Sequence, residues 1–402
     1  MTKKLIALLM ALCMVASLAA CGTNGDPQTT TAPAGTEAAG NTEAVETTEA
    51  PVAADPVKIG VLVADVSGEE ALGFRAYYET YIAANYNVEI LYSDELADAA
   101  AEKAAIEKFA AQGCQAIISL ASSDRAMQIE TCADYGLYYA IASGMLEDAQ
   151  YETYKTNEFF VGQIGPSMDT EYEAGVAMGK HFADKGVSTV AIYGAFIPNP
   201  MHVYRLAGTL VGLGISYGGA SDKDAIVGQI FGDMGLNPEK CEGDVTIVAY
   251  LQGFGDTTYP ELDAAIQAAP DAFLSVGMAT TFFTQNLNGA GIEFSDIDSF
   301  TSANGEAMAN GKLVYLAGKY SSSIGPVFAA VMNAVNGNVI RDAEGNALSI
   351  SQGYLVATDA ASFEQYYTAD KGDSPIFSKE VLDTIIGSDI TYDVFVAVVE
   401  GI

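Results

Sequence analysis

The chain has 402 residues, half of them hydrophobic, and its 52 acidic and 18 basic side chains give a formal net charge of −34. A body this acidic does not bind nucleic acid by neutralising phosphates. The charge also keeps the body away from anionic lipid surfaces, and it favours solubility without specifying a fold. The length favours two domains or one large domain.

The first twenty residues have the build of a cleavable export signal. Lys3 and Lys4 precede an uncharged apolar run over 5–15, which is too short to cross a hydrocarbon core of about 30 Å as a helix. The run leads to the letters LAAC, which resemble the bacterial lipobox, where a Cys receives diacylglycerol and becomes the new N-terminus. We therefore predict a signal peptide over 1–20 and a lipid anchor on Cys21 at the outer face of the cell membrane.

The segment that follows the lipobox reads as a spacer. Residues 22–56 contain no aromatic residue and no Leu, Ile, Met, Lys or Arg. Such a composition buries too little apolar surface to offset the entropy of ordering the chain. We predict that 21–56 is a disordered acidic spacer between the lipid and a folded body.

The cysteines and histidines after the spacer indicate no metal site. Cys114, Cys132 and Cys241 match no metal-binding spacing, and three is an odd number for a disulfide framework. We interpret them as small buried hydrophobes, with a Cys114–Cys132 bridge as the alternative. The only histidines are His181 and His202, which excludes a His-rich metal site.

The first half of the body alternates short apolar runs with helical periodicity. Repeated βαβ units of this length predict a parallel sheet with helices on both faces. The pattern predicts strands over 57–64, 88–92, 116–120 and 137–142, and helices over 71–82, 98–112 and 124–135.

The same alternation starts again in the second half, which favours two doubly wound sheets over one very wide sheet. Residues 214–243 break the rhythm and are predicted to be an insertion with a short helix near 225–234. The tail over 359–402 is predicted to pack on the second lobe. The pattern predicts helices over 171–184, 201–213, 260–269, 279–288 and 325–336, and strands over 189–193, 245–250, 272–276, 313–317 and 353–357.

Five segments resemble, in the same order, segments of the type I periplasmic (solute-binding) proteins, above all their ribose- and galactose-like branch. The resemblance covers about residues 57–358. The segments are KIGVLVADVSGEEALGF, QAIISLASSDRAM, HVYRLAGTLVGLG, AAPDAFLSVGMATTFFTQNLNGAGI and MANGKLVYLAGKYSSSIGPVFAAVMNAVNGN.

This resemblance implies an α/β fold of two Rossmann-like lobes joined by three hinge crossovers, near 163–167, 319–323 and 347–353. The expected N-terminal lobe is 57–165 plus 321–348, and the expected C-terminal lobe is 166–320 plus 349–402 with the tail. Ligands of open α/β sheets bind beyond the carboxyl ends of the strands, so a ligand is expected between the lobes, which close on it by a hinge motion.

The resemblance also places candidate ligand residues. Arg205 corresponds to the family's ligand-contacting Arg, and its planar guanidinium suits vicinal hydroxyls or a carboxylate. Its alternative is a surface Arg paired with a nearby acid. For the Ser and Asp candidates the alternative is ordinary strand-end capping. The other candidates are Ser67, Glu70, Ser122, Ser123, Asp124, Ser143, Phe196, Asn304, Lys319 and Tyr320.

Departures from the sugar-binding branch at Ser143, Gly277 and Lys319 bear on the ligand. Ser143 and Gly144 stand where that branch has Asp followed by Arg. The chain therefore lacks a carboxylate that would accept hydrogen bonds from sugar hydroxyl groups. Lys319 stands where a Gln is usual, and it either favours an anionic ligand or is a hinge-surface lysine. A sugar or sugar-like ligand is expected, with a nucleoside or a carboxylate left open.

The expected function is ligand capture for an ABC importer, with a membrane permease and ATPase as partners and no cofactor. The protein is expected to be a monomer. The alternative is a sensor that presents its ligand to a membrane receptor or histidine kinase, which the sequence does not separate from import. No nucleophile elbow, metal-ligand pair or Gly-rich phosphate loop is found, so an enzyme is not expected.

Overall fold

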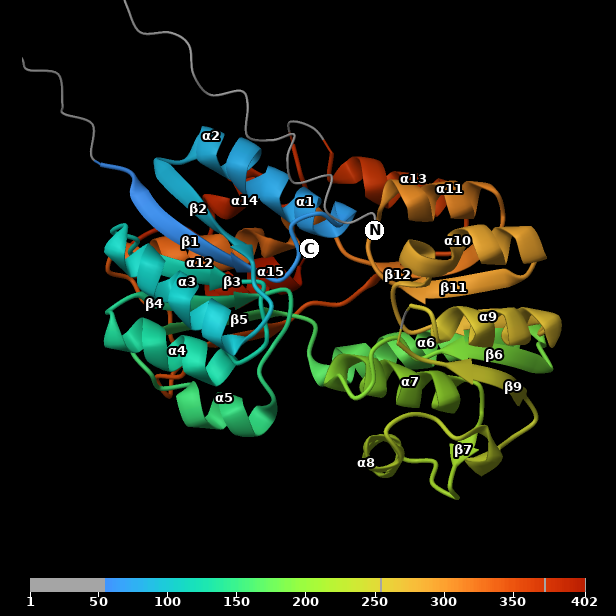
Figure 1. Cartoon of the computed structure of the whole chain (residues 1–402). Coiled ribbons are helices and arrows are strands. Elements are labelled where there is room, and N and C mark those ends of the chain that lie inside the picture. The colour runs from blue at the N-terminus through green and yellow to red at the C-terminus, as the bar shows by residue number, and fades with distance from the viewer. Residues whose placement is uncertain (1–54, 254, 372–373, 402) are drawn as a thin grey trace, which may run out of the picture. The chain divides into compact units, whose positions relative to one another are not determined.

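The computed structural model describes residues 55–253, 255–371 and 374–401 (Figure 1). The predicted signal peptide, the lipid-anchored Cys21 and nearly all of the spacer lie outside the described residues. Within the described residues, no helix combines the length and the apolar character that crossing a membrane requires.

The first sheet is entirely parallel and has the strand order β13-β5-β4-β3-β1-β2. Side chains of β1 alternate between two cores, with Ile59 and Val61 on one face and Leu62 on the other. The sheet is therefore buried on both faces, as the apolar runs predict. Its strands are β1 (Val57–Val63), β2 (Val88–Glu95), β3 (Ala116–Ser119), β4 (Tyr138–Ala142), β5 (Phe160–Gly165) and β13 (Leu348–Ser351).

The helices of the first lobe cover both faces of this sheet (Figure 1). Phe74 and Phe328 lie in the core on one face, and Ile106 and Ile129 lie in the core on the other. The helices are α1 (Glu69–Ala76), the π-helical turn η1 (Tyr77–Ile82), α2 (Ala83–Asn85), α3 (Ala99–Ala111), α4 (Arg125–Asp134), α5 (Asp148–Tyr154), η3 (Ser321–Ile324) and α12 (Gly325–Val335).

The second sheet has the strand order β14-β12-β11-β10-β6-β9, and it is parallel except for β14, which runs antiparallel to β12. The prediction of two doubly wound lobes is thus confirmed. The strands are β6 (Thr189–Tyr193), β9 (Thr246–Leu251), β10 (Ala272–Ser275), β11 (Glu293–Ile297), β12 (Leu313–Gly318) and β14 (Leu355–Ala357); the helices are α6 (Met168–Lys185), α7 (Pro200–Gly212), α9 (Thr258–Gln267), α10 (Ala279–Ala290), α11 (Ser302–Ala309) and α13 (Ala360–Ala369).

Helices α6 and α7 touch backbone to backbone because glycines lie at their contact. A Cβ on Gly175 would lie 2.1 Å from the carbonyl oxygen of Arg205, and one on Gly208 would lie 2.0 Å from that of Tyr172. This close approach brings Glu171 of α6 against Arg205 of α7, where their side chains form an ion pair.

The predicted insertion is a small unit of its own on the second lobe. It holds the two-stranded pair β7 (Ser216–Tyr217) and β8 (Cys241–Glu242), helix α8 (Lys223–Asp233) and the 3₁₀ turn η2 (Pro238–Lys240). The predicted helix near 225–234 corresponds to α8. The Tyr217 hydroxyl donates to the Asp233 carboxylate over 2.7 Å and ties the pair of strands to the helix.

The prediction that the whole tail packs on the second lobe is wrong. Helix α13 does pack there through Phe363, but Leu382 and Phe395 are buried in the core of the first lobe. They lie in α14 (Lys379–Leu382) and α15 (Tyr392–Glu400). Apolar side chains of the tail cover a face of α12, where the Asn333 side-chain amide donates to the carbonyl oxygen of Ile385 over 2.7 Å. The chain therefore passes between the two cores once more after β14.

The three described cysteines are unpaired, so a Cys114–Cys132 bridge is wrong. Cys114 and Cys132 are buried, which confirms their interpretation as small hydrophobes, whereas Cys241 is only half-buried. Burial raises the pKa of Cys114 to about 11. Among the described residues, no group of three His, Cys, Asp or Glu side chains is placed to hold a metal ion.

Candidate functional site

The carboxyl ends of the two sheets meet at direct hydrogen bonds. Lys319, which follows β12, donates from Nζ to the Ser143 hydroxyl after β4 over 2.7 Å. The same Nζ lies 3.4 Å from the Glu70 carboxylate of α1. Glu70 in turn accepts a hydrogen bond of 2.5 Å from the Ser299 hydroxyl, which follows β11. Three of the predicted ligand residues, Glu70, Ser143 and Lys319, are thus brought together.

A second contact between the two lobes joins α1 to α11. The Glu69 carboxylate accepts hydrogen bonds of 2.7 Å from both the backbone N–H and the hydroxyl of Ser302. Ser302 is the first residue of α11, so a carboxylate of the first lobe caps a helix of the second. Such a contact is favourable because the N-terminus of a helix carries partial positive charge.

The charge of Glu70 is stabilised by its neighbours. Burial by itself would raise the pKa of this carboxyl. The positive charge of Lys319 and the hydrogen bonds from Ser299 and Lys319 outweigh that effect, and the pKa of Glu70 is lowered. Glu70 is therefore an anion that accepts hydrogen bonds.

Arg205 is buried and almost fully bonded within the second lobe. Its Nε donates to Glu171 over 2.6 Å. Nη1 donates to the carbonyl oxygens of Val276 and Ile297 over 2.8 and 3.0 Å. Nη2 donates to the Tyr354 hydroxyl over 2.7 Å. Four of the five guanidinium N–H groups are therefore occupied, and Arg205 offers a ligand one N–H.

This network fastens the ends of β10 and β11 to α6 and to the crossover before β14. The Tyr354 hydroxyl also lies 3.0 Å from both carboxylate oxygens of Glu171. Burial lowers the pKa of Arg205, but Glu171 and Tyr354 outweigh it and leave the pKa raised. Arg205 is thus permanently charged and neutralised by its own lobe.

Two acids at the carboxyl end of β11 are absent from the sequence prediction. Asp296 is fully buried and accepts hydrogen bonds from the Ser275 hydroxyl and the Thr280 N–H over 2.8 and 3.0 Å. Burial raises the pKa of Asp296 to about 6. Burial, with the charges of Asp296 and Glu70 nearby, raises the pKa of Asp298 well above its ordinary value. Asp298 is thus a carboxyl at a strand end, close to Glu70 and Arg205.

A signal for Asp298 exists in the sequence, in the letters EFSDID. They were not read as a strand, so their carboxyl end was not considered as part of the site. Asn304 was proposed instead. It is fully buried in α11, and its amide donates to the carbonyl oxygen of Ser299 over 2.7 Å. Asn304 therefore supports the turn that carries Ser299.

The predicted contacts from the loop after β3 are largely used by the protein itself. Ser122, Ser123 and Asp124 are exposed. The Asp124 side chain caps α4 by accepting from the Met127 N–H over 2.9 Å. The N–H groups of Ser123 and Asp124 donate to the buried Glu102 carboxylate over 2.8 and 3.1 Å. The capping alternative thus describes Asp124.

Ser67 has a similar local role. Its N–H and hydroxyl both donate to Asp65, over 2.9 and 3.2 Å, in the turn before α1. Tyr320 packs with Phe300 and Tyr366, with ring centres 6.4 Å apart in both pairs. Tyr320 and Lys319 also line a cavity of about 400 Å³ along the crossovers.

Phe196 lies near a histidine that was not among the predicted site residues. The rings of Phe196 and His202 have centres 5.9 Å apart, and the Phe196 N–H donates to His202 Nδ1 over 3.2 Å. A Cβ on Gly277 would lie 3.4 Å from His202 Nε2 and 3.2 Å from Arg205 Nη1. Burial and the charge of Arg205 lower the pKa of His202 to about 4, so the imidazole is neutral.

A cavity of about 540 Å³ lies between the two lobes, within the size range of small-molecule sites. Residues of the β4–α5 segment form one wall, including Met145 and Tyr151. Tyr204 of α7 and Lys223 and Phe231 of α8 form the other. The insertion therefore contributes to the space between the lobes.

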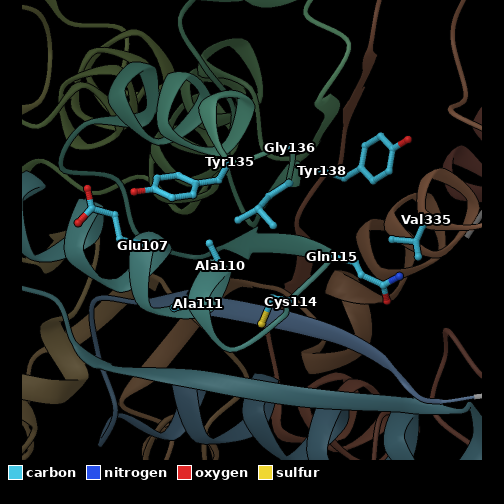
Figure 2. A pocket seen from close by; sticks show the side chains of 10 residues that line it. Glu107, Ala110, Ala111, Cys114, Gln115, Tyr135, Gly136, Tyr138 and Val335 are labelled. Carbon is cyan, nitrogen blue, oxygen red and sulfur yellow. The ribbon is translucent and has the colours of Figure 1, made fainter.

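Another hollow lies at the opposite ends of the strands. Figure 2 shows Cys114, Gln115 and Tyr138, near the amino ends of β3 and β4, with Val335 at the end of α12. Its volume is about 610 Å³. Because it does not adjoin the carboxyl ends of the strands, it is separate from the candidate site.

No protein-family model matches the chain, and neither does any curated protein. Solved structures do match. The periplasmic component of an arabinose ABC transporter from Shewanella sp. ANA-3, bound to L-arabinofuranose, is 15% identical, with 78% of this chain and 95% of that chain covered at a TM-score of 0.55.

Two further matches are solute-binding proteins of ABC transporters. One, from Actinobacillus succinogenes 130z with bound D-allose, is 14% identical and covers 77% of this chain and 100% of its own at a TM-score of 0.56. The other, from Bacillus halodurans C-125 with bound myo-inositol, is 16% identical. The match covers 79% of this chain and 99% of that chain at a TM-score of 0.55. The chain therefore has the fold of the type I periplasmic binding proteins.

Proposed function

We propose that the protein is the extracytoplasmic solute-binding subunit of an ABC importer. It captures a small polar ligand between its lobes and delivers it to a membrane permease and ATPase. One observation carries the proposal: the loops after β4, β11 and β12 and the start of α1 meet through Ser143, Lys319, Glu70 and Ser299. The ligands named for the structurally similar proteins, which are sugars and a polyol, support it.

The chemistry of the site suits a ligand rich in hydroxyls. Glu70 accepts hydrogen bonds, and Lys319 and the remaining N–H of Arg205 donate them, which matches the two roles of a hydroxyl. Asp298 and His202 join the proposed ligand residues. Ser67, Ser122, Ser123, Asp124, Phe196, Asn304 and Tyr320 are assigned to the rim and support of the site.

The proposed function is binding without chemical conversion. Of the two histidines, His202 contacts Phe196 and His181 packs against Phe182 and Tyr315. Within the part of the chain that the structure describes, neither is hydrogen-bonded to a Ser or Cys that it could activate as a nucleophile. The lobes are proposed to close on the ligand as hinged bodies.

Thermal unfolding with a panel of sugars, polyols, sugar acids and nucleosides tests the proposal. A ligand at 100 times its Kd stabilises the folded state by about 2.7 kcal/mol, which is readily measured as a rise in Tm. Native mass spectrometry of freshly purified protein identifies any ligand that it retains. Failure of every compound class to raise the Tm, together with an empty mass spectrum, would contradict the proposal.

The lipid anchor is a separate part of the proposal and rests on the LAAC segment alone. The expected product of processing begins at Cys21 and carries diacylglycerol, and the protein is recovered with membranes. A Cys21→Ser variant is expected to lose the lipid and leave the membrane fraction. Unchanged membrane recovery of that variant would rule out the anchor.

A further inference from the structure

Arg125 is a largely buried arginine whose guanidinium is only partly hydrogen-bonded within the described residues. It is the first residue of α4, at the carboxyl end of β3. Its Nη1 donates to the carbonyl oxygen of Met145 over 2.6 Å, whereas its buried Nε has no hydrogen-bond partner. Among the described residues, no carboxylate oxygen lies within 4.0 Å of the Arg125 guanidinium, the distance that defines an ion pair. A largely buried cation without a counter-ion is costly.

The Glu102 carboxylate, whose charge acts on Arg125, is bonded to other groups. The Glu102 carboxylate accepts from the N–H groups of Ser123 and Asp124 and from the Gln128 side-chain amide over 2.8, 3.1 and 2.7 Å. Burial lowers the pKa of Arg125, and the nearby Tyr139 and Glu102 only partly offset that effect. Within the described residues, the charge of Arg125 is therefore not paired with a carboxylate and could be compensated by a bound anion.

The surrounding backbone leaves room for the guanidinium. A Cβ on Gly144 would lie 2.8 Å from Arg125 Nη2, so a larger residue there would displace the group. The preceding residue, Ser143, holds the Nζ of Lys319. Two cations, Arg125 and Lys319, therefore contact the same two-residue turn at the edge of the first sheet that meets the second lobe.

The two cations are not equivalent. Lys319 has the Glu70 carboxylate 3.4 Å from its Nζ, so its charge is largely compensated. Arg125 has no such partner, and its contact residue Met145 lines the cavity of about 540 Å³ between the lobes. The planar N–H groups of an arginine can bind a carboxylate through two parallel hydrogen bonds.

We propose that Arg125 binds a carboxylate of the ligand, and that the solute is therefore a small hydroxylated acid, such as a sugar acid, rather than a neutral sugar. This inference rests on the proposed function of solute capture. It distinguishes the chain from the similar structures named above, whose bound ligands, L-arabinofuranose, D-allose and myo-inositol, carry no carboxylate.

Calorimetric titration with matched acids and neutral compounds tests the inference. The probes are D-galacturonate, D-glucuronate and D-gluconate, each compared with its methyl ester or with the parent sugar. The wild-type protein is expected to bind at least one acid with an affinity about ten times that for its ester, or higher. Hydrogen bonds to charged groups are stronger than those between neutral groups. Arg125→Gln is expected to reduce that ratio to near one.

The matched control is Arg75→Gln, because Arg75 lies on the same lobe but is exposed and pairs with Glu79. Its ratio of acid to ester affinity is expected to equal the wild-type ratio. Arg125→Lys keeps the charge and is expected to retain part of the preference. If Arg125→Gln does not fold, Arg125→Lys and the acid-to-ester ratio of the wild type still decide the question.

The outcomes separate this inference from the function on which it rests. Binding of neutral sugars or esters as tightly as the acids, or an unchanged preference in a folded Arg125→Gln protein, overturns the inference and leaves solute capture standing. Absence of binding by every acid and every neutral compound of the panel overturns both.

Discussion

The two lobes place an arginine at equivalent edges of their sheets, but the two side chains have opposite surroundings. In the second lobe, Arg205 has four N–H groups bonded and Glu171 as its counter-ion. In the first lobe, Arg125 has one hydrogen bond and no carboxylate partner among the described residues. A resemblance to a binding motif therefore does not identify the binding group, because partners within the fold can use up its hydrogen-bond donors.

The lobes also differ in how the chain completes them. The second core is built around β10, β11, α6 and α7, with Arg205 bonded across them. The first core requires the end of the chain, since Leu382 and Phe395 are fully buried in it. Changes at these places are therefore expected to act on one lobe at a time.

The largest expected effect comes from breaking the ion pair of the second lobe. Arg205→Met leaves the Glu171 carboxylate buried without a counter-ion, which costs about 3–5 kcal/mol of the free energy of unfolding. Urea denaturation measures the loss. The double variant Glu171→Leu with Arg205→Met is expected to recover much of it, because neither charge then remains buried.

The control for this prediction is Arg75→Met, which removes an exposed pair with Glu79 and is expected to cost about 1 kcal/mol or less. An Arg205→Met protein no less stable than this control would show that the network does not hold the second lobe together.

The next effect concerns the tail and the first lobe. Leu382→Ala deletes a fully buried side chain and is expected to cost about 2–5 kcal/mol in chemical denaturation. Val394→Ala, also in the tail but 45% exposed, is the matched control and is expected to change stability little. Equal stability of the two variants would contradict the placement of the tail in the first core.

A smaller effect is the pH dependence that Asp296 gives to the second lobe. Its pKa is about 6 in the folded state against 3.8 for an ordinary aspartate. The folded state therefore binds the proton more tightly, and the contribution of Asp296 to stability falls as the pH rises from about 4 to about 6. The difference between the pH profiles of the wild type and Asp296→Asn measures it.

Asp271→Asn gives a contrast of opposite sign. Hydrogen bonds from the backbone of Ser188 and Thr189 lower the pKa of Asp271, so its contribution is lost as the pH falls through that pKa. If the stability advantage of the wild type over Asp296→Asn shrinks toward low pH, as is expected for Asp271→Asn, the assignment is disproved.

The smallest expected effect is on contact between the lobes. Glu69→Gln weakens the hydrogen bonds to Ser302, which is expected to remove about 0.5–1 kcal/mol of the free energy of closure. The ratio of closed to open protein is then expected to fall by about two- to fivefold. Electron–electron distance measurements between spin labels on the two lobes report that ratio. Glu79→Gln is the control, because Glu79 pairs with Arg75 of its own lobe. Identical distance distributions for both variants would exclude a role for Glu69 in closure.

Much of the fold follows from apolar periodicity. The predicted strand over 189–193 is β6, and that over 57–64 is β1 within one residue. Strands β5, β11 and β13 were missed, and the segment 347–353, expected as a crossover, holds β13. Strands β5 and β11 contain polar side chains whose partners are remote in sequence. Gln163 of β5 accepts from the Leu146 N–H, and Asp296 of β11 accepts from Ser275. A pattern of apolar residues does not predict polar side chains that are buried through hydrogen bonds to residues remote in sequence.

The candidate site was predictable only in part, for the same reason. Glu70, Ser143 and Lys319 follow from the rule that ligands lie beyond strand ends, and the structure brings them together. Asp298 was missed along with its strand. Asp124 was predicted as a ligand residue although it caps α4, because Ser and Asp suit both roles.

The sequence by itself determined the two-lobed α/β architecture and the strand ends at which a ligand is expected, since both depend on local periodicity and order along the chain. The tertiary structure alone decided which arginine remains available. The partners of Arg205 lie 34, 71, 92 and 149 residues away from it along the chain. Hydrogen-bond saturation depends on atoms that only folding brings together, and it separates Arg125 from Arg205.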